Sequence, residues 1–149
     1  MWPFRRRDRS KEREGEASWS VAQGDYDGAP LFARIRSDPG PRFRQSHVHR
    51  VGVAVPLRAP DARGLPQPEE FARLAEIEDI LSAAFESNSK SIHVLSITTS
   101  GMREFVFYAC DPGWVELTLS SIQGQVPDHE LQLAIEHDPE WSVYGQFSQ

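Results

Sequence analysis

The sequence has 149 residues, of which 39% are hydrophobic and 26% charged, and it carries a formal net charge of -6. This length suits one ordinary domain and is short for two. The acidic balance, with a pI near 5.3, argues against non-specific binding to nucleic acid, because such binding needs a basic surface that displaces counterions from phosphates. We therefore expect one domain with one core and no nucleic-acid partner.

The cellular compartment can be inferred from three features. The single cysteine, Cys110, excludes an intramolecular disulfide and fits a reducing environment. The first residues are basic but are not followed by an apolar segment, so they do not predict a secretory signal. No apolar run approaches the roughly 20 residues that a membrane-spanning helix needs. We expect a cytoplasmic protein.

Charged residues dominate positions 1–17 and leave almost nothing to bury after Phe4. This composition favours a disordered charged tail. Trp2, Phe4 and the neighbouring arginines would make only a marginal membrane anchor, because they form a single basic cluster with two aromatic residues. We therefore expect a solvated tail over 1–17, without stable membrane association, and a single α+β domain over 18–149.

Two short extended segments flank the dipeptide Asp27-Gly28, which is typical of a β-hairpin turn. Asp25 and Asp27 also resemble the opening of a calcium loop. The EF-hand spacing would then place Pro30 at the invariant glycine and Arg36 at the bidentate glutamate, so a turn is the better interpretation. The proline-rich and glycine-rich stretch that follows, 37–46, predicts a loop.

The longest regular pattern runs from Glu69 to Glu86 and predicts an amphipathic helix. Pro68 precedes it, and the acidic pair Glu69 and Glu70 suits the positive end of the helix dipole. At about 100° per residue, its apolar side chains form one stripe, which consists of Phe71, Leu74, Ile77, Leu81, Ala84 and Phe85.

Strands are predicted on both sides of this helix. The runs with alternating or β-branched apolar residues are 50–57, 91–99, 103–110 and 130–138, the last as an edge strand. Segment 112–123 fits either a helix or a strand; Asp111 as N-cap and Pro112 as first helical residue favour the helix. The order predicts an α+β fold, a ferredoxin-like βαββαβ sandwich preceded by an N-terminal β-hairpin that extends the sheet or covers part of its open face.

Glu78 interrupts the apolar stripe of the helix. A carboxylate on the core side must be paired, hydrogen-bonded or protonated, because leaving its charge buried alone is costly. Three arginines on predicted strands are candidate partners: Arg34, Arg50 and Arg103. We favour a structural Glu–Arg pair that fixes the helix on the sheet, with a ligand-binding carboxylate as the alternative.

Motifs for other chemistry are weak. His47 and His49 would share one face of a strand, but a metal site needs further ligands and no carboxylate or cysteine is apparent nearby. Cys110 and the hydroxyls of 96–100 lie in no thiol-enzyme or GxSxG context, and no Walker or dinucleotide glycine loop occurs. We expect no metal, no cofactor and no catalytic residue. Near the end, Trp141, Tyr144 and Phe147 recur every three residues, as in a short helix that caps the core.

Several short motifs occur together in a fixed order. They are Trp19 with Asp27-Gly28-x-Pro30-Leu31-x-x-Arg34, His49-Arg50-Val51-Gly52-Val53, Gly64-Leu65-Pro66, Ile77-Glu78-Asp79, Arg103-Glu104-Phe105-x-Phe107-Tyr108 and Asp138-Pro139-Glu140-Trp141-x-x-Tyr144. Over 19–147 they resemble the family catalogued as domain of unknown function 695. That family is similar in turn to the regulator B family of ribonuclease E, small acidic proteins that inhibit a nuclease by binding it. The resemblance implies a ferredoxin-like fold and a regulatory role, and no catalytic residue; the very acidic tail of those regulators is missing here.

Two functional hypotheses follow. The first is a non-enzymatic protein-interaction or regulatory module, which docks an unidentified protein through its sheet or through Trp141 and Tyr144. The alternative is a small-ligand-binding protein or enzyme with a pocket around Glu78, Arg34 and His49, to which Arg50 could contribute; a concave cavity there would favour it. An edge strand over 130–137 could also pair with a second copy of the chain in a homo-oligomer.

Overall fold

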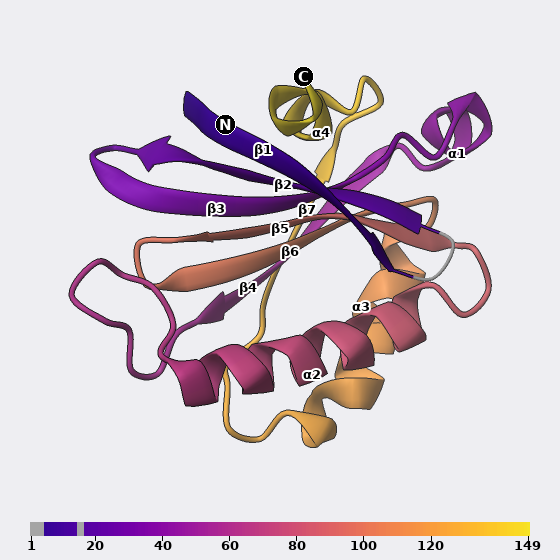
Figure 1. Ribbon diagram of the computed structural model, residues 1–149. Helices are drawn as coiled ribbons and strands as arrows, with labels where there is room; N and C mark the ends of the chain where they lie inside the picture. The colour runs from indigo at the N-terminus through magenta and orange to yellow at the C-terminus, as the bar shows by residue number, and fades with distance from the viewer. Residues whose placement is uncertain (1–4, 15–16) are drawn as a thin grey trace.

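The computed structural model describes residues 5–14 and 17–149 (Figure 1). Its strands are β1 (Arg5–Glu14), β2 (Ala17–Tyr26), β3 (Ala29–Arg36), β4 (His49–Pro56), β5 (Ser91–Thr99), β6 (Met102–Ala109) and β7 (Gln132–His137). Its helices are α1 (Pro41–Ser46), α2 (Pro68–Phe85), α3 (Pro112–Ile122), the 3-10 turn η1 (Gln123–Gln125) and α4 (Ser142–Ser148). None of the described helices is long and apolar enough to cross a membrane.

The strands form one antiparallel sheet in the order β1-β2-β3-β5-β6-β4-β7. Within it, β4-α2-β5-β6-α3-β7 has the ferredoxin-like arrangement, with the fourth, first, third and second strands of the unit side by side. The hairpin β2–β3 extends the sheet through β3, which pairs with β5. Its turn contains Asp27 at φ 49° and Gly28 at φ 81°, as a tight hairpin turn requires. The predicted fold is confirmed.

Two apolar layers lie on opposite faces of the sheet. On one face, α2 and α3 pack on side chains of β4 and β6, such as Val53 and Phe107. On the other, α4 and the residue before it pack Trp141, Tyr144 and Phe147 against β3, β5 and β6. Figure 1 shows α2 and α3 below the sheet and α4 above it. The predicted aromatic cap of the core is therefore confirmed.

The predicted amphipathic helix is α2, which buries Leu74, Ile77, Leu81 and Phe85. Phe71 differs from the prediction, because its side chain is 57% exposed. The surface beneath this first turn of the helix is a hollow lined by polar and apolar groups, not the closed core. The ambiguous segment is the helix α3, and its N-cap Asp111 accepts a hydrogen bond from the Trp114 N–H.

Two segments contain more regular structure than the sequence predicted. Residues 37–46 include the short helix α1, which begins at Pro41; proline suits this first helical position, although its frequency in the stretch indicated a loop. Within the expected tail, Arg5–Glu14 forms β1 and pairs with β2. An exposed edge such as that of β2 offers backbone groups to almost any extended segment, and composition does not reveal this. Positions 1–4, including Trp2 and Phe4, lie outside the described residues.

Gly64 fixes the loop between β4 and α2 on the turn between β5 and β6. Its φ is 81°, its carbonyl accepts a hydrogen bond of 2.8 Å from the Gly101 N–H, and a Cβ at this position would lie 3.0 Å from backbone atoms of Ser100 and Gly101. The close approach holds Leu65 and Pro66 beside the first turn of α2, where both line the hollow under Phe71.

Replacement of Gly64 by alanine tests this contact. We expect Gly64→Ala to lower the free energy of unfolding by about 2–4 kcal/mol, from an unfavourable φ and from contact with backbone that cannot easily move. Gly28→Ala is the matched control, because Gly28 has the same φ of 81° and no atom within 4 Å of an added Cβ; it should lose only about 1 kcal/mol. Urea unfolding measures the stability of both variants. Equal losses of unfolding free energy would contradict a stabilising role for the contact between Gly64 and the β5–β6 turn.

Candidate functional site

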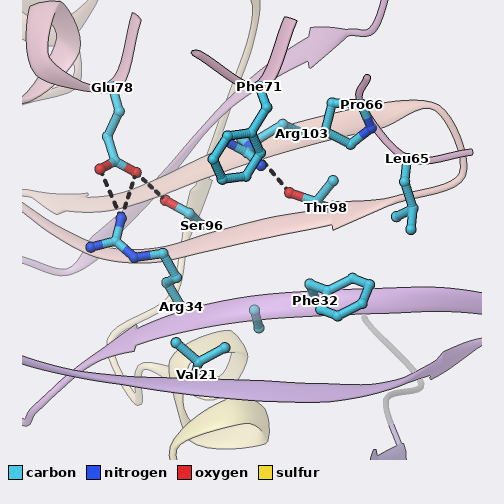
Figure 2. A pocket seen from close by; sticks show the side chains of 11 residues that line it. Val21, Phe32, Arg34, Leu65, Pro66, Phe71, Glu78, Ser96, Thr98 and Arg103 are labelled. Carbon is cyan, nitrogen blue, oxygen red and sulfur yellow. Dashed lines mark hydrogen bonds and ion pairs between the residues drawn. The ribbon is translucent and has the colours of Figure 1, made fainter. Parts of the chain in front are cut away.

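A pocket lies between α2 and the part of the sheet formed by β2, β3, β5 and β6 (Figure 2). It exists because the helices pack mainly on β4 and β6, while the hairpin extends the sheet beyond them. Its volume is about 400 Å³. The residues that line it are Val21, Phe32, Ala33, Arg34, Leu65, Pro66, Phe71, Glu78, Ser96, Thr98 and Arg103.

Strand register brings the polar residues of the pocket together. Arg34 is paired with Ser96, and Thr98 is paired with both Phe32 and Arg103. A register shift in β5 between His93 and Leu95 makes this possible. His93 packs among the aromatic rings under α2. The shift adds one residue to β5 after His93, so that the even-numbered Ser96 and Thr98 face α2 on the same side of the sheet as His93.

Glu78 and Arg34 form an ion pair across the pocket. Arg34 Nη1 lies 3.0 Å from Glu78 Oε1 and 2.8 Å from Oε2, and the Ser96 hydroxyl donates to Oε1 at 2.8 Å. Burial acts to raise the pKa of the Glu78 carboxyl, but the charges of His93 and Arg34 and the Ser96 hydrogen bond outweigh it, so that the pKa lies below its usual value. Of the three arginines that the sequence offered to Glu78, Arg34 is the partner.

His93 continues this network into the core. Its Nε2 lies 2.9 Å from the Leu95 carbonyl oxygen and 3.1 Å from the Ser96 hydroxyl, and its ring stacks on Phe107 with 4.8 Å between centroids. Burial lowers the pKa of His93, while the negative charges of Glu78 and Glu86 act in the opposite direction. The sequence did not assign His93 or Ser96 to the site, because β5 contains several polar residues and their pattern does not show which of them face α2.

Arg103 occupies the other end of the pocket. Its Nε–H donates to the Thr98 hydroxyl at 2.7 Å, and its guanidinium carbon lies 5.4 Å from the centre of the Phe71 ring. Burial lowers the pKa of Arg103, while the negative charge of Glu78 acts in the opposite direction. Among the described residues, no carboxylate forms an ion pair with Arg103.

Arg50 and His49 do not belong to this pocket, although they were predicted to contribute to it. Arg50 alternates with the core valines of β4 and therefore lies on the other face, where it pairs with Glu136 at 2.6 Å and approaches Glu104 at 3.9 Å. His49 lies beside His137, with 5.5 Å between the ring centroids. Both residues lie on β4, and two strands, β5 and β6, separate β4 from the strand β3 that carries Arg34. His49 and Arg50 are therefore not brought next to Arg34.

The other candidate residues have structural contacts. Trp141 is fully buried, stacks on Tyr108 and donates from Nε1 to the His47 carbonyl at 2.8 Å. Tyr144 is also buried, and its hydroxyl donates to the Arg36 carbonyl. The ring of His47 lies within hydrogen-bond distance of Ser46 and Ser89. Over the described residues, no group of three histidine, cysteine, aspartate or glutamate side chains could hold a metal ion.

A second polar cluster joins the start of α2 to the segment before β7. Asp128 accepts hydrogen bonds from Arg73 Nε and Nη2, both at 2.9 Å. His129 lies between two carboxylates, 2.6 Å from Glu70 and 3.1 Å from Asp128. Because these groups satisfy one another, we interpret the cluster as structural.

The fold and the pocket define the class of protein: an α+β protein with a ferredoxin-like core and an added β-hairpin. A ligand-sized hollow lies between helix α2 of the core and this hairpin. The chain belongs to the family described as "Family of unknown function (DUF695)", whose family model matches residues 17–148. No curated protein and no solved structure matched the chain. The expected relation to the regulator B family of ribonuclease E has no support in these comparisons.

Glu78→Gln separates a structural from a binding role for this carboxylate. Because the pair is only partly exposed, at 15% for the Glu78 and 27% for the Arg34 side chain, we expect a loss of about 2 kcal/mol in unfolding free energy. Glu76→Gln is the control on the same helix, since its pair with Arg73 is exposed and is worth at most about 0.5 kcal/mol. Thermal and urea unfolding measure both variants; a loss no larger than that of the control would contradict the structural role.

Stability should depend on pH through Asp128. The Arg73 hydrogen bonds, against a smaller effect of burial, hold the pKa of Asp128 well below its usual 3.8. The ionised Asp128 therefore contributes its full stabilisation at pH values above 3.8, its usual pKa. This contribution to the free energy of unfolding is lost as the pH falls towards the lower pKa of the folded state. We expect Asp128→Asn to be less stable than the wild type by about 1 kcal/mol at neutral pH, with the difference shrinking in acid.

The control for this pH dependence is Asp79→Asn. Asp79 is exposed on α2, so its replacement removes the same charge without removing the Arg73 contact. Urea unfolding across the acidic range should show a difference from the wild type that depends on pH for Asp128→Asn and stays small for Asp79→Asn. A pH-independent difference for Asp128→Asn would exclude the proposed linkage.

Proposed function

We propose that this protein is a small-ligand-binding module, which takes up a largely apolar molecule in the pocket between α2 and the β2–β3 hairpin. The observation that carries the proposal is the concave pocket of about 400 Å³. Its size falls within the range of roughly 300–1,000 Å³ that is typical of small-molecule sites.

The lining of the pocket supports this function. Such sites combine apolar and aromatic walls with a few convergent polar groups. Here Val21, Phe32 and Phe71 supply the apolar surface, and Arg103 and the Arg34–Glu78 pair supply the polar groups. Phe71 is also a large apolar side chain exposed at a pocket, where a ligand could cover it.

The interaction-module hypothesis has less support. It named Trp141 and Tyr144 as contact residues, and both are buried in the core, where they cannot meet a partner without rearrangement. The position of β7 at the edge of the sheet is compatible with pairing to another strand, but no feature of that edge selects a partner. We therefore prefer the ligand-binding alternative, and we assign no catalytic role to its residues.

Filling the pocket tests the proposal. Val21 is half-buried and lines the pocket from β2, so Val21→Trp places a large side chain in the hollow. We expect fragments of the aryl-alkyl class, neutral and charged, to shift the amide NMR signals of Phe32, Ser96 and Thr98 in the wild type. In Val21→Trp their affinity should fall by about tenfold or more, a loss of roughly 1.4 kcal/mol.

The matched control is Leu117→Trp, which adds tryptophan to an exposed position of α3 outside the pocket lining. This variant should bind the fragments as the wild type does. The proposal fails if no fragment of the set shifts the pocket signals, or if Val21→Trp binds as tightly as the control.

A further inference from the structure

We propose that the ligand of this pocket is an amphipathic carboxylate, whose carboxylate group binds the guanidinium of Arg103 and whose apolar body packs between Phe71 and Phe32. This inference rests on the proposed ligand-binding function and specifies its chemical class. It is carried by the charges, hydrogen bonds and ring contacts of the pocket.

The charge balance of the pocket favours an anion. Glu78 is engaged by Arg34 and Ser96, so this pair contributes no net charge and its carboxylate is not available to a cationic ligand. Arg103 adds a second positive charge, and none of the described carboxylates forms an ion pair with it. A half-buried cation of this kind gains most from a ligand that supplies the missing negative charge.

The hydrogen bonds of Arg103 favour a carboxylate in particular. Its Nε–H is held by the Thr98 hydroxyl at 2.7 Å, which fixes the guanidinium plane and leaves the terminal Nη groups as donors. Two parallel N–H groups match the two oxygens of a carboxylate. A phosphate dianion would need a second positive charge, and the guanidinium of Arg34, which also lines the pocket, already binds Glu78.

The surroundings of Arg103 favour an apolar body attached to this carboxylate. The Phe71 ring covers the guanidinium at 5.4 Å, and Phe32 lies on β3 opposite Thr98. Leu65 and Pro66 close the same side of the pocket (Figure 2). An aryl or alkyl chain can contact these side chains while its carboxylate reaches Arg103, whereas a small hydrophilic anion would leave them exposed to water.

The test compares phenylbutyrate with phenylbutanol, which share an apolar body and differ in charge. NMR titration of the wild-type protein should show that phenylbutyrate binds about tenfold or more tightly, as expected for a charge-assisted bidentate contact. In Arg103→Met, the affinity for phenylbutyrate should fall to that for phenylbutanol, and the affinity for phenylbutanol should stay the same. Arg103→Lys should fall between them, since it keeps the charge and loses the paired donors.

Two further variants guard against a merely structural effect. Arg42→Met removes the same charge from an exposed position on α1 and should bind both compounds as the wild type does. Thr98→Val removes the hydroxyl that accepts the hydrogen bond of Arg103 and orients its guanidinium. The affinity for phenylbutyrate should fall several-fold, while the affinity for phenylbutanol should not fall. A circular dichroism spectrum and a thermal melt of each variant establish that it is folded.

The outcomes separate this inference from the function on which it rests. Equal binding of the two compounds to the wild type would overturn the carboxylate assignment and leave ligand binding intact. An equal loss of both compounds in Arg103→Met would show that Arg103 only shapes the pocket, which also overturns the assignment. If neither compound binds, while other fragments shift the pocket signals, the inference alone fails; if no fragment binds, both fail.

Discussion

The Arg34–Glu78 ion pair is the interaction on which the geometry of the pocket depends. It joins α2, the principal helix of the ferredoxin-like unit, to β3, a strand that this unit does not require. A helix packed only by its apolar stripe can shift along a sheet at little cost. An ion pair in which Arg34 Nη1 contacts both oxygens of Glu78, and in which Ser96 holds the same carboxylate, restricts that shift. The pair therefore sets the position of α2 over the added hairpin, and the space between them becomes a defined hollow.

The hollow also explains features that would otherwise look like defects in packing. Phe71 remains exposed although it lies on the apolar stripe of α2, because the surface below it is the pocket. The register shift in β5 turns Ser96 and Thr98 towards α2, where two hydroxyls would be unfavourable in a closed core. At the other end, the contact between Gly64 and the β5–β6 turn holds Leu65 and Pro66 as a wall. Helix, strand and loop thus converge on one site.

The elements were predictable from the sequence because each has a local signature. The periodicity of α2, the alternation in β4 and β7 and the Asp27-Gly28 turn each report a local constraint, and so does Glu78, a carboxylate in an apolar stripe. The sequence could not show that Arg34, and not Arg50, is the partner of Glu78, because this depends on strand order and on the face of the sheet that each arginine occupies. The roles of His93, Ser96 and Arg103 depend on a register shift of one residue, which has no clear sequence signal.

Arg103 is the feature of the pocket that stability alone does not explain. A half-buried guanidinium without a counter-ion opposes folding, and an apolar residue of similar size would pack against Phe71 and Phe32 without that cost. The other buried or half-buried charges described above have carboxylate or guanidinium partners, as Arg73, Asp128 and Glu78 do. Local departures from otherwise consistent packing and pairing tend to mark functional sites. An anion-binding site requires a positive charge that is held in place before the ligand arrives. Arg103 is oriented by Thr98, lies against Phe71 and forms no ion pair with a carboxylate of the described residues.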